Sequence, residues 1–132
     1  MTKTRSELRE KCMIILYQWE IYKNNNSEMP IDEIIEKNIE IDNDFVKDIV
    51  YGVITHKNEI DEIANKNMNE WSIERIDKTG ASILRIGIFE LMYTDTPEIV
   101  VINEAIELAK KYSDDNVRKI INAILDKLIK EK

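Results

Sequence analysis

The sequence predicts an all-α fold of two packed helical subdomains, with about three helices in the first and three or four in the second. Breakers are scarce, with three glycines and two prolines in 132 residues, and 43% of the residues are hydrophobic. Apolar residues recur at i, i+3, i+4 and i+7 in several segments, and no long stretch alternates with the period of two that marks a strand. These observations together favour helices throughout.

Three helices are predicted in residues 1–70. The first covers about residues 5–22, because Leu8, Cys12 and Ile15 fall on one face of a helix. A short helix follows Pro30. A longer third helix begins after a cap at Asp42 or Asn43 and is expected to bend near His56.

Residues 71–132 predict the second subdomain. Apolar residues lie on more than one side of segment 83–91, so this segment is expected to be the buried central helix. The last helix keeps the apolar spacing without a break from Val117 to Ile129. Each of the three helices in this part has a candidate cap. In chain order the caps are Asp77, then Thr96 ahead of Pro97, then Ser113 or Asp114.

Packing explains several residues that could otherwise suggest chemistry. Gly52 lies inside a predicted helix, where glycine costs about 1 kcal/mol relative to alanine, so we expect a neighbouring helix to approach it closely. Cys12 is the single cysteine and lies among apolar positions, which predicts a buried, reduced thiol. Glu104 and Glu107 are interpreted as the polar edge of a packed helix.

Catalytic and metal-binding constellations are scarce. One histidine and one cysteine exclude a Cys/His metal cluster, and three isolated glycines form no phosphate-binding loop. No apolar run is long enough to span a bilayer, and the polar start of the chain leads into no signal-peptide core. We therefore expect a cytoplasmic, non-catalytic protein without cofactor or metal, and without a membrane role.

The charge is unevenly distributed along the chain. The net charge is −7, but residues 1–23 carry a balance of +2, residues 24–74 a balance of −9, and residues 75–132 equal numbers of each sign. A general nucleic-acid binder normally has a basic excess. A small basic patch in the first helix can still bind RNA, weakly and with strong salt dependence.

Five ordered elements resemble the NusB family of transcription antitermination factors. They are LYQWE at 16–20, Gly52, ILRIGIFEL at 83–91, VINEAIELAK at 101–110, and Asn122 with LDKL at 125–128. The resemblance implies a single NusB-like domain over residues 1–132, with helical subdomains 1–70 and 71–132. It also implies an antitermination factor that binds boxA RNA together with a small-subunit ribosomal protein, called NusE in this role. Such a factor works within the RNA polymerase antitermination complex, either as a monomer or as a homodimer.

The resemblance also implies the site residues. The RNA-binding positions that it implies are Lys3, Arg5, Arg9 and Lys11, and the partner-binding positions are Tyr17, Lys78 and Gly80. Ser6 and Glu7 stand where the family commonly has arginines, so we expect weak RNA affinity for this chain alone. Gly80 stands where the family often has glutamate, which removes one charged contact to the partner. A position at the edge of the core is an equal alternative for Tyr17.

Two other functions stay open at this point. One is the NusB-like accessory RNA-binding domain of a ribosomal RNA cytosine methyltransferase, which would require the chain to be a fragment because it ends soon after its last helix. The other is a helical scaffold that binds protein alone, which the acidic balance and the thin arginine patch favour.

Overall fold

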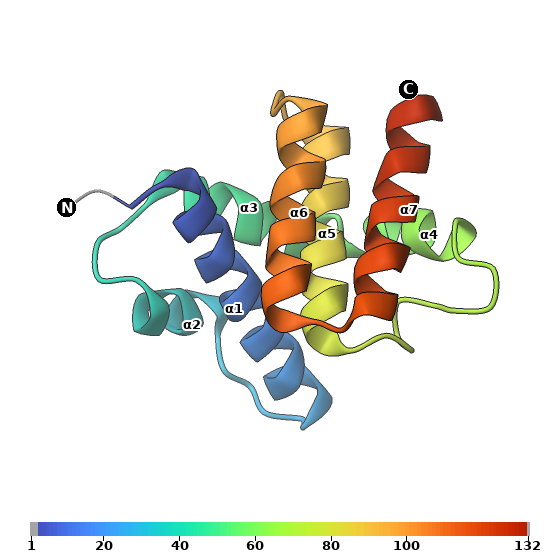
Figure 1. The fold of residues 1–132 in the computed structure, drawn as a ribbon. Coiled ribbons are helices and arrows are strands. Elements are labelled where there is room, and N and C mark those ends of the chain that lie inside the picture. The colour runs from blue at the N-terminus through green and yellow to red at the C-terminus, as the bar shows by residue number, and fades with distance from the viewer. Residues whose placement is uncertain (1–2, 132) are drawn as a thin grey trace.

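The structure is a computed structural model that describes residues 3–131. Within that range it contains seven α-helices and no strand, which confirms the predicted all-α fold (Figure 1). The helices are α1 (Arg5–Asn24), α2 (Ile31–Asn38), α3 (Asp44–Thr55), α4 (Lys57–Lys66), α5 (Lys78–Tyr93), α6 (Glu98–Tyr112) and α7 (Asp115–Glu131). None of the helices in the described range is both long and apolar enough to cross a membrane.

The predicted long third helix is divided into α3 and α4 at His56. This residue ends α3 and begins α4, with φ −102° and ψ 15°. Its ring stacks on Tyr93 at a centroid distance of 4.1 Å. The chain before residue 70 therefore contains four helices instead of three.

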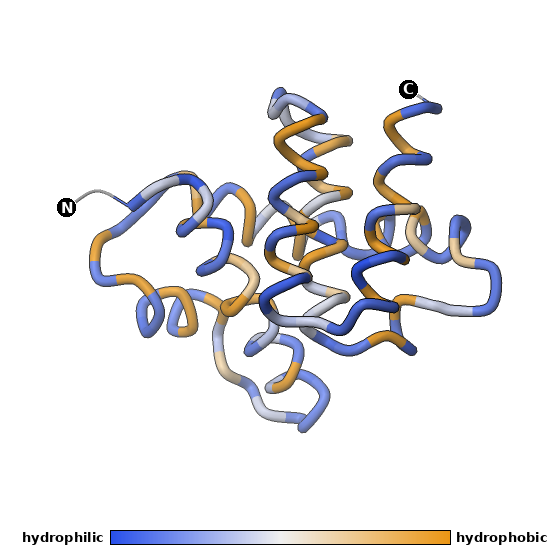
Figure 2. The backbone as a smooth tube through the Cα atoms, viewed as in Figure 1, coloured by the Kyte–Doolittle hydropathy of each residue, from blue (hydrophilic) through white to orange (hydrophobic). Residues whose placement is uncertain are grey.

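Helix α5 is the centre of the molecule. Every residue from Gly80 to Leu91 is buried, and the helix packs against α1, α3, α4, α6 and α7. Apolar segments recur along α5, α6 and α7 where these helices lie together (Figures 1 and 2). Residue 70 lies in the connection between α4 and α5, but the buried apolar side chains on both sides of it form one core.

Side chains cap two of the N-terminal helices. Thr4 and Glu7 form a reciprocal capping box at the start of α1, signalled by the pattern Thr-x-x-Glu. Asn43, one of the two expected candidates, accepts a hydrogen bond from the Val46 backbone N–H at 3.0 Å and caps α3. The starts of both helices are therefore fixed by local polar contacts.

The starts of α6 and α7 refine the predictions. Pro97 occupies the cap position of α6 itself, so Thr96 lies one residue outside the cap. Asp114 caps α7 by accepting a hydrogen bond from the Val117 N–H at 2.8 Å. Ser113 instead donates its hydroxyl hydrogen bond to Asp77, the residue that caps α5.

Gly52 is a packing glycine, as its place in the sequence indicates. A Cβ atom added there would overlap the ring of Phe89 from α5. The absent side chain therefore permits α3 and α5 to approach each other.

We predict that Gly52→Ala destabilises the protein. Overpacking typically costs about 1–3 kcal/mol, which exceeds the roughly 1 kcal/mol that alanine gains over glycine in a helix. Urea denaturation should show a free energy of unfolding lower by up to about 2 kcal/mol. The loss should shrink in a Phe89→Leu background, because the smaller side chain leaves room for the methyl group; an equal loss in both backgrounds would contradict the packing explanation.

Candidate nucleic-acid interface

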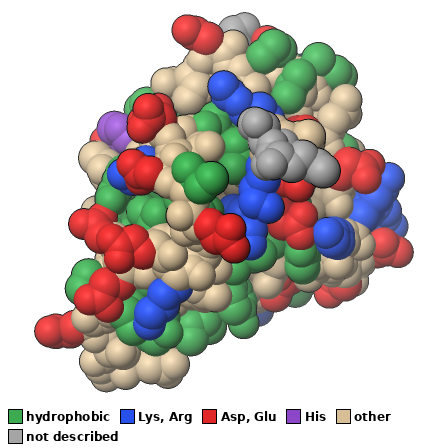
Figure 3. All heavy atoms as spheres, turned by 90° about the vertical axis from the view of Figure 1, so that its left-hand side faces the viewer, with side chains coloured by type: hydrophobic (Ala, Val, Ile, Leu, Met, Phe, Trp, Pro, Cys, Tyr) green, Lys and Arg blue, Asp and Glu red, His purple; other side chains and the backbone are tan. Residues whose placement is uncertain are grey.

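The start of α1 places basic side chains on one face of the molecule. Figure 3 shows Lys and Arg side chains near the centre of this face, with Asp and Glu side chains on either side. Lys3 and Arg5 are exposed, and Lys11 is half-buried. The basic patch is therefore small and has acidic borders.

Arg9 points inward from this patch. Its Nε and Nη2 donate to the two carboxylate oxygens of Glu90 on α5, at 2.7 and 2.8 Å. The two side chains are only 5% and 2% exposed. The hydrogen bonds to Glu90 raise the pKa of Arg9 above its ordinary value. An RNA contact by Arg9 would require this bidentate pair to open, so Arg9 is not part of the exposed basic surface.

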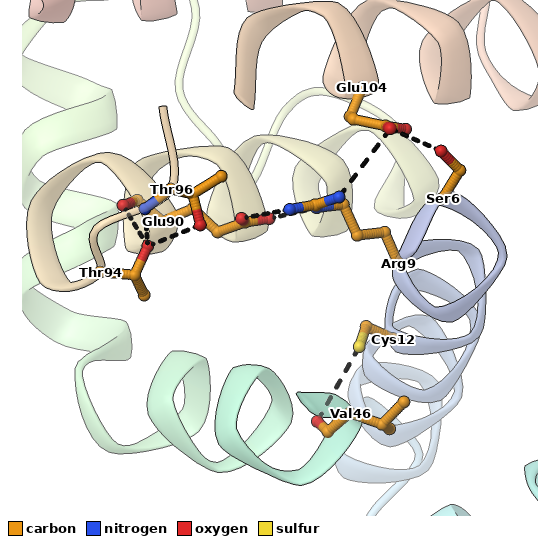
Figure 4. Close-up of polar contacts among 8 residues, drawn as sticks. All are labelled: Ser6, Arg9, Cys12, Val46, Glu90, Thr94, Thr96 and Glu104. Atoms are coloured by element: carbon orange, nitrogen blue, oxygen red, sulfur yellow. Dashed lines mark hydrogen bonds and ion pairs between the residues drawn. The ribbon is translucent and has the colours of Figure 1, made fainter. Parts of the chain in front are cut away.

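Glu104 from α6 completes the arrangement around Arg9 (Figure 4). Its Oε1 accepts a hydrogen bond from the Ser6 hydroxyl at 2.5 Å and lies 3.8 Å from Nη1 of Arg9. Glu104 is 24% exposed. The first turns of α1 are thereby attached to α5 by a buried ion pair and to α6 by a more accessible one.

Two carboxylates beside the patch have partners within the protein. Glu7 accepts hydrogen bonds from the Thr4 backbone N–H and hydroxyl, each at 3.1 Å, and the backbone bond is the main reason that the pKa of Glu7 is lowered. Glu10 accepts from the Tyr112 hydroxyl and from Lys111, which lower the pKa of Glu10 in that order. Both groups remain charged at neutral pH, so their negative charge stays beside the basic patch.

Phe45, from the first turn of α3, lies under the arginines. The Cζ atom of Arg5 is 4.1 Å from the ring centroid of Phe45, and that of Arg9 is 5.2 Å away. Among residues 3–131 no carboxylate lies within ion-pair distance of Arg5. The contact between this ring and the arginines could not be predicted from the sequence, because nothing local to α3 indicates that α1 crosses it.

The expected partner-binding residues differ in accessibility. Tyr17 on α1 is 38% exposed, and Lys78, the first residue of α5, is half-buried. Gly80 is buried, and a Cβ atom there would lie 2.5 Å from Cγ1 of Val117 on α7. Gly80 therefore permits close packing of α7, and its place at a partner contact stays a prediction.

The structure brings some of the expected residues together and separates others. Arg5 and Arg9 are one helical turn apart and share the Phe45 ring. Lys11 and Tyr17 are six residues apart, which turns them about 120° from each other around the helix axis. An RNA surface at the start of α1 and a partner surface at Tyr17 would therefore lie on different sides of the same helix.

The single cysteine lies in the core, where it packs and does not react. Cys12 is fully buried, its thiol lies 3.8 Å from the carbonyl oxygen of Val46, and burial raises the thiol pKa far above its ordinary value. A thiol in this state is a poor nucleophile. In the described part of the chain no three His, Cys, Asp or Glu side chains are grouped so that they could hold a metal ion.

Comparison with known proteins covers almost the whole chain. The NusB family matches residues 6–130. Transcription antitermination protein NusB of Macrococcus caseolyticus is 40% identical over 131 residues, which are 98% of this chain and 98% of the relative. The NusB protein of Campylobacter jejuni is 41% identical, with the same coverage of both chains.

Solved structures agree with this fold. T. maritima NusB superposes with a TM-score of 0.86 at 28% identity, covering 99% of this chain and 94% of that one. A chain from a structure of antitermination factors NusB and NusE in complex with dsRNA has a TM-score of 0.83 at 26% identity and covers 100% of both chains.

We predict that Glu90→Gln destabilises the protein far more than Glu104→Gln. Removing one charge of a buried pair leaves the other uncompensated and costs about 3 kcal/mol or more. A more exposed and more distant pair contributes at most about 1 kcal/mol. Urea denaturation of the two variants measures the difference, and losses of equal size would show that Glu90 is not the main partner of Arg9.

Proposed function

This chain belongs to the NusB family, and we propose from that membership that it is an antitermination factor which binds boxA RNA together with the ribosomal protein NusE. The observation that carries the proposal is the match to NusB antitermination proteins at about 40% identity, over 98% of their length. The likeness to a NusB chain solved with NusE and dsRNA supports the same pair of partners. The proposed role is non-catalytic and cytoplasmic, within the RNA polymerase antitermination complex.

The basic patch supports RNA binding of modest strength. Lys3, Arg5 and Lys11 are the cations on the α1 start that are not held by a buried carboxylate. RNA affinity rises with the number of phosphates that are neutralised. It falls as the salt concentration rises, because the counterions displaced from the RNA are then released into a more concentrated solution. Three contacts bordered by acidic side chains favour weak binding by the chain alone and stronger binding with NusE.

Tyr17 and Lys78 are the proposed contacts to NusE. A tyrosine on a helix surface is a suitable anchor, because it buries a large apolar area and keeps its hydroxyl at the polar rim. A homodimer is also compatible with this proposal, with a second copy of the chain contacting the surface that carries Tyr17 and Lys78.

A scaffold that binds protein alone is the second candidate. It is favoured by the net charge of −7 and by the inward position of Arg9. The accessory domain of a methyltransferase is less well supported, because the relatives that match over 98% of their length are antitermination proteins.

A titration of labelled boxA RNA, with and without NusE and over a range of salt concentrations, tests RNA binding. We expect weak binding by the chain alone and tighter binding with NusE. Each phosphate contact to single-stranded RNA adds roughly −0.7 to the slope of log K against log salt concentration. If all three cations contact phosphates, this chain should therefore contribute about −2 to the slope.

The outcomes of this titration separate the candidates. Tight binding by the isolated chain at physiological salt would contradict the weak patch. Absence of RNA binding even with NusE, while NusE itself still binds, would leave the protein-only scaffold as the function.

We predict that Tyr17→Ala weakens binding of NusE about tenfold, the effect typical of an interface tyrosine. Tyr51→Ala is a matched control, because Tyr51 is 37% exposed and Tyr17 is 38% exposed, but Tyr51 lies on α3. Isothermal titration calorimetry gives both dissociation constants. Equal effects of the two variants would place the NusE contact elsewhere.

A further inference from the structure

We infer that Phe45 is a positioning residue of the RNA site, whose ring holds the Arg5 guanidinium ready for a phosphate. The inference rests on the proposed RNA binding and adds a residue to it. It follows from the contrast between two arginines that lie over one ring and differ in what else holds them.

The ring of Phe45 has a fixed position. Asn43 caps the first turn of α3 through the Val46 N–H, and Val46 is fully buried. The Cys12 thiol on α1 contacts the carbonyl oxygen of the same residue. Phe45 therefore belongs to a turn that is attached to both the core and α1, and its side chain also packs against the core.

In Arg9, a carboxylate occupies donors of the guanidinium that a phosphate could otherwise use. Its Cζ atom lies 5.2 Å from the Phe45 centroid, and Glu90 accepts hydrogen bonds from its Nε and Nη2. An arginine has five N–H donors in one plane and no acceptor. A bidentate carboxylate occupies one of the edges that a phosphate could use, and Arg9 is only 4% exposed, so its other donors are not open to RNA either.

Arg5 is held by the aromatic ring and not by a carboxylate. Its Cζ atom lies 4.1 Å from the ring centroid, and within the described residues no acidic side chain is paired with it. A ring face attracts the positive charge through its quadrupole and leaves the N–H edges of the guanidinium open. Arg5 is thus partly ordered before RNA arrives, and its donors remain available.

Partial ordering has an energetic consequence for binding. A long side chain that is already restrained loses less conformational freedom when it contacts a phosphate. A cation–π contact at an exposed site corresponds to about a two- to fivefold change in an equilibrium constant. Loss of the ring should therefore weaken RNA binding by about this factor, although Phe45 itself carries no charge.

The experiment is a double-mutant cycle with Phe45→Leu and Arg5→Ala, measured by fluorescence anisotropy of boxA RNA in the presence of saturating NusE. Phe45→Leu should weaken binding about two- to fivefold and keep the salt slope, because the arginine charge remains. Arg5→Ala should weaken binding and flatten the salt slope by about 0.7. In the Arg5→Ala background, Phe45→Leu should have no further effect.

Two further variants exclude a merely structural effect. Phe45→Tyr keeps the aromatic face and should restore the affinity of the unaltered chain. Tyr51→Leu removes another accessible ring from α3 and should leave RNA binding unchanged. Thermal unfolding and NusE binding of every variant report whether the fold is retained.

The outcomes also separate this inference from the function on which it rests. Absence of RNA binding by the unaltered chain with NusE would overturn the proposed function and this inference together. Normal binding with additive effects of the two substitutions would overturn the inference alone, because Phe45 would then act independently of Arg5. The same holds if Phe45→Leu has no effect on affinity.

Discussion

Two buried ion pairs of opposite polarity join α1 to α5, and the rest of the structure depends on them. Arg9 of α1 pairs with Glu90 of α5, and farther along α1 Glu20 pairs with Arg85 of α5. The order of these partners makes the two helices antiparallel. If α1 shifted by one turn, both pairs would break. Arg85 would keep Asp61 of α4 as a partner, but Arg9, Glu90 and Glu20 would lie near the core without these partners, which is strongly unfavourable. Apolar side chains alone would permit such a shift more readily, so the charges specify the alignment.

This alignment decides which basic residues reach the surface. Glu90 holds Arg9 inside the protein. Arg5 lies one turn earlier in α1, and its guanidinium lies over the Phe45 ring. The same contact that fixes the helices therefore leaves a thin basic patch on an acidic protein. One of the two arginines near the start of α1 is thus used to hold the fold and not to extend the basic surface.

Much of the fold could be predicted from the sequence, because helical periodicity and capping residues are local signals. The break at His56 was expected only as a bend, since the ring that stacks on it comes from a distant helix. The candidate site was less predictable. Arg5 and Arg9 look equivalent in the sequence, and only the long-range partner Glu90 distinguishes them. Gly80 matched a partner-contact position, but whether it is exposed depends on how closely α7 approaches.

The central place of α5 has a consequence for the order of events during synthesis. A ribosome makes the chain from its N-terminus, so α1 and α4 emerge while the segment that contains Arg85 and Glu90 has not yet been made. Until then Glu20 and Asp61 lack their common partner Arg85, and the apolar faces of these helices have no α5 to cover them. The N-terminal half therefore cannot complete its packing until α5, and with it more than two thirds of the protein, has left the ribosome.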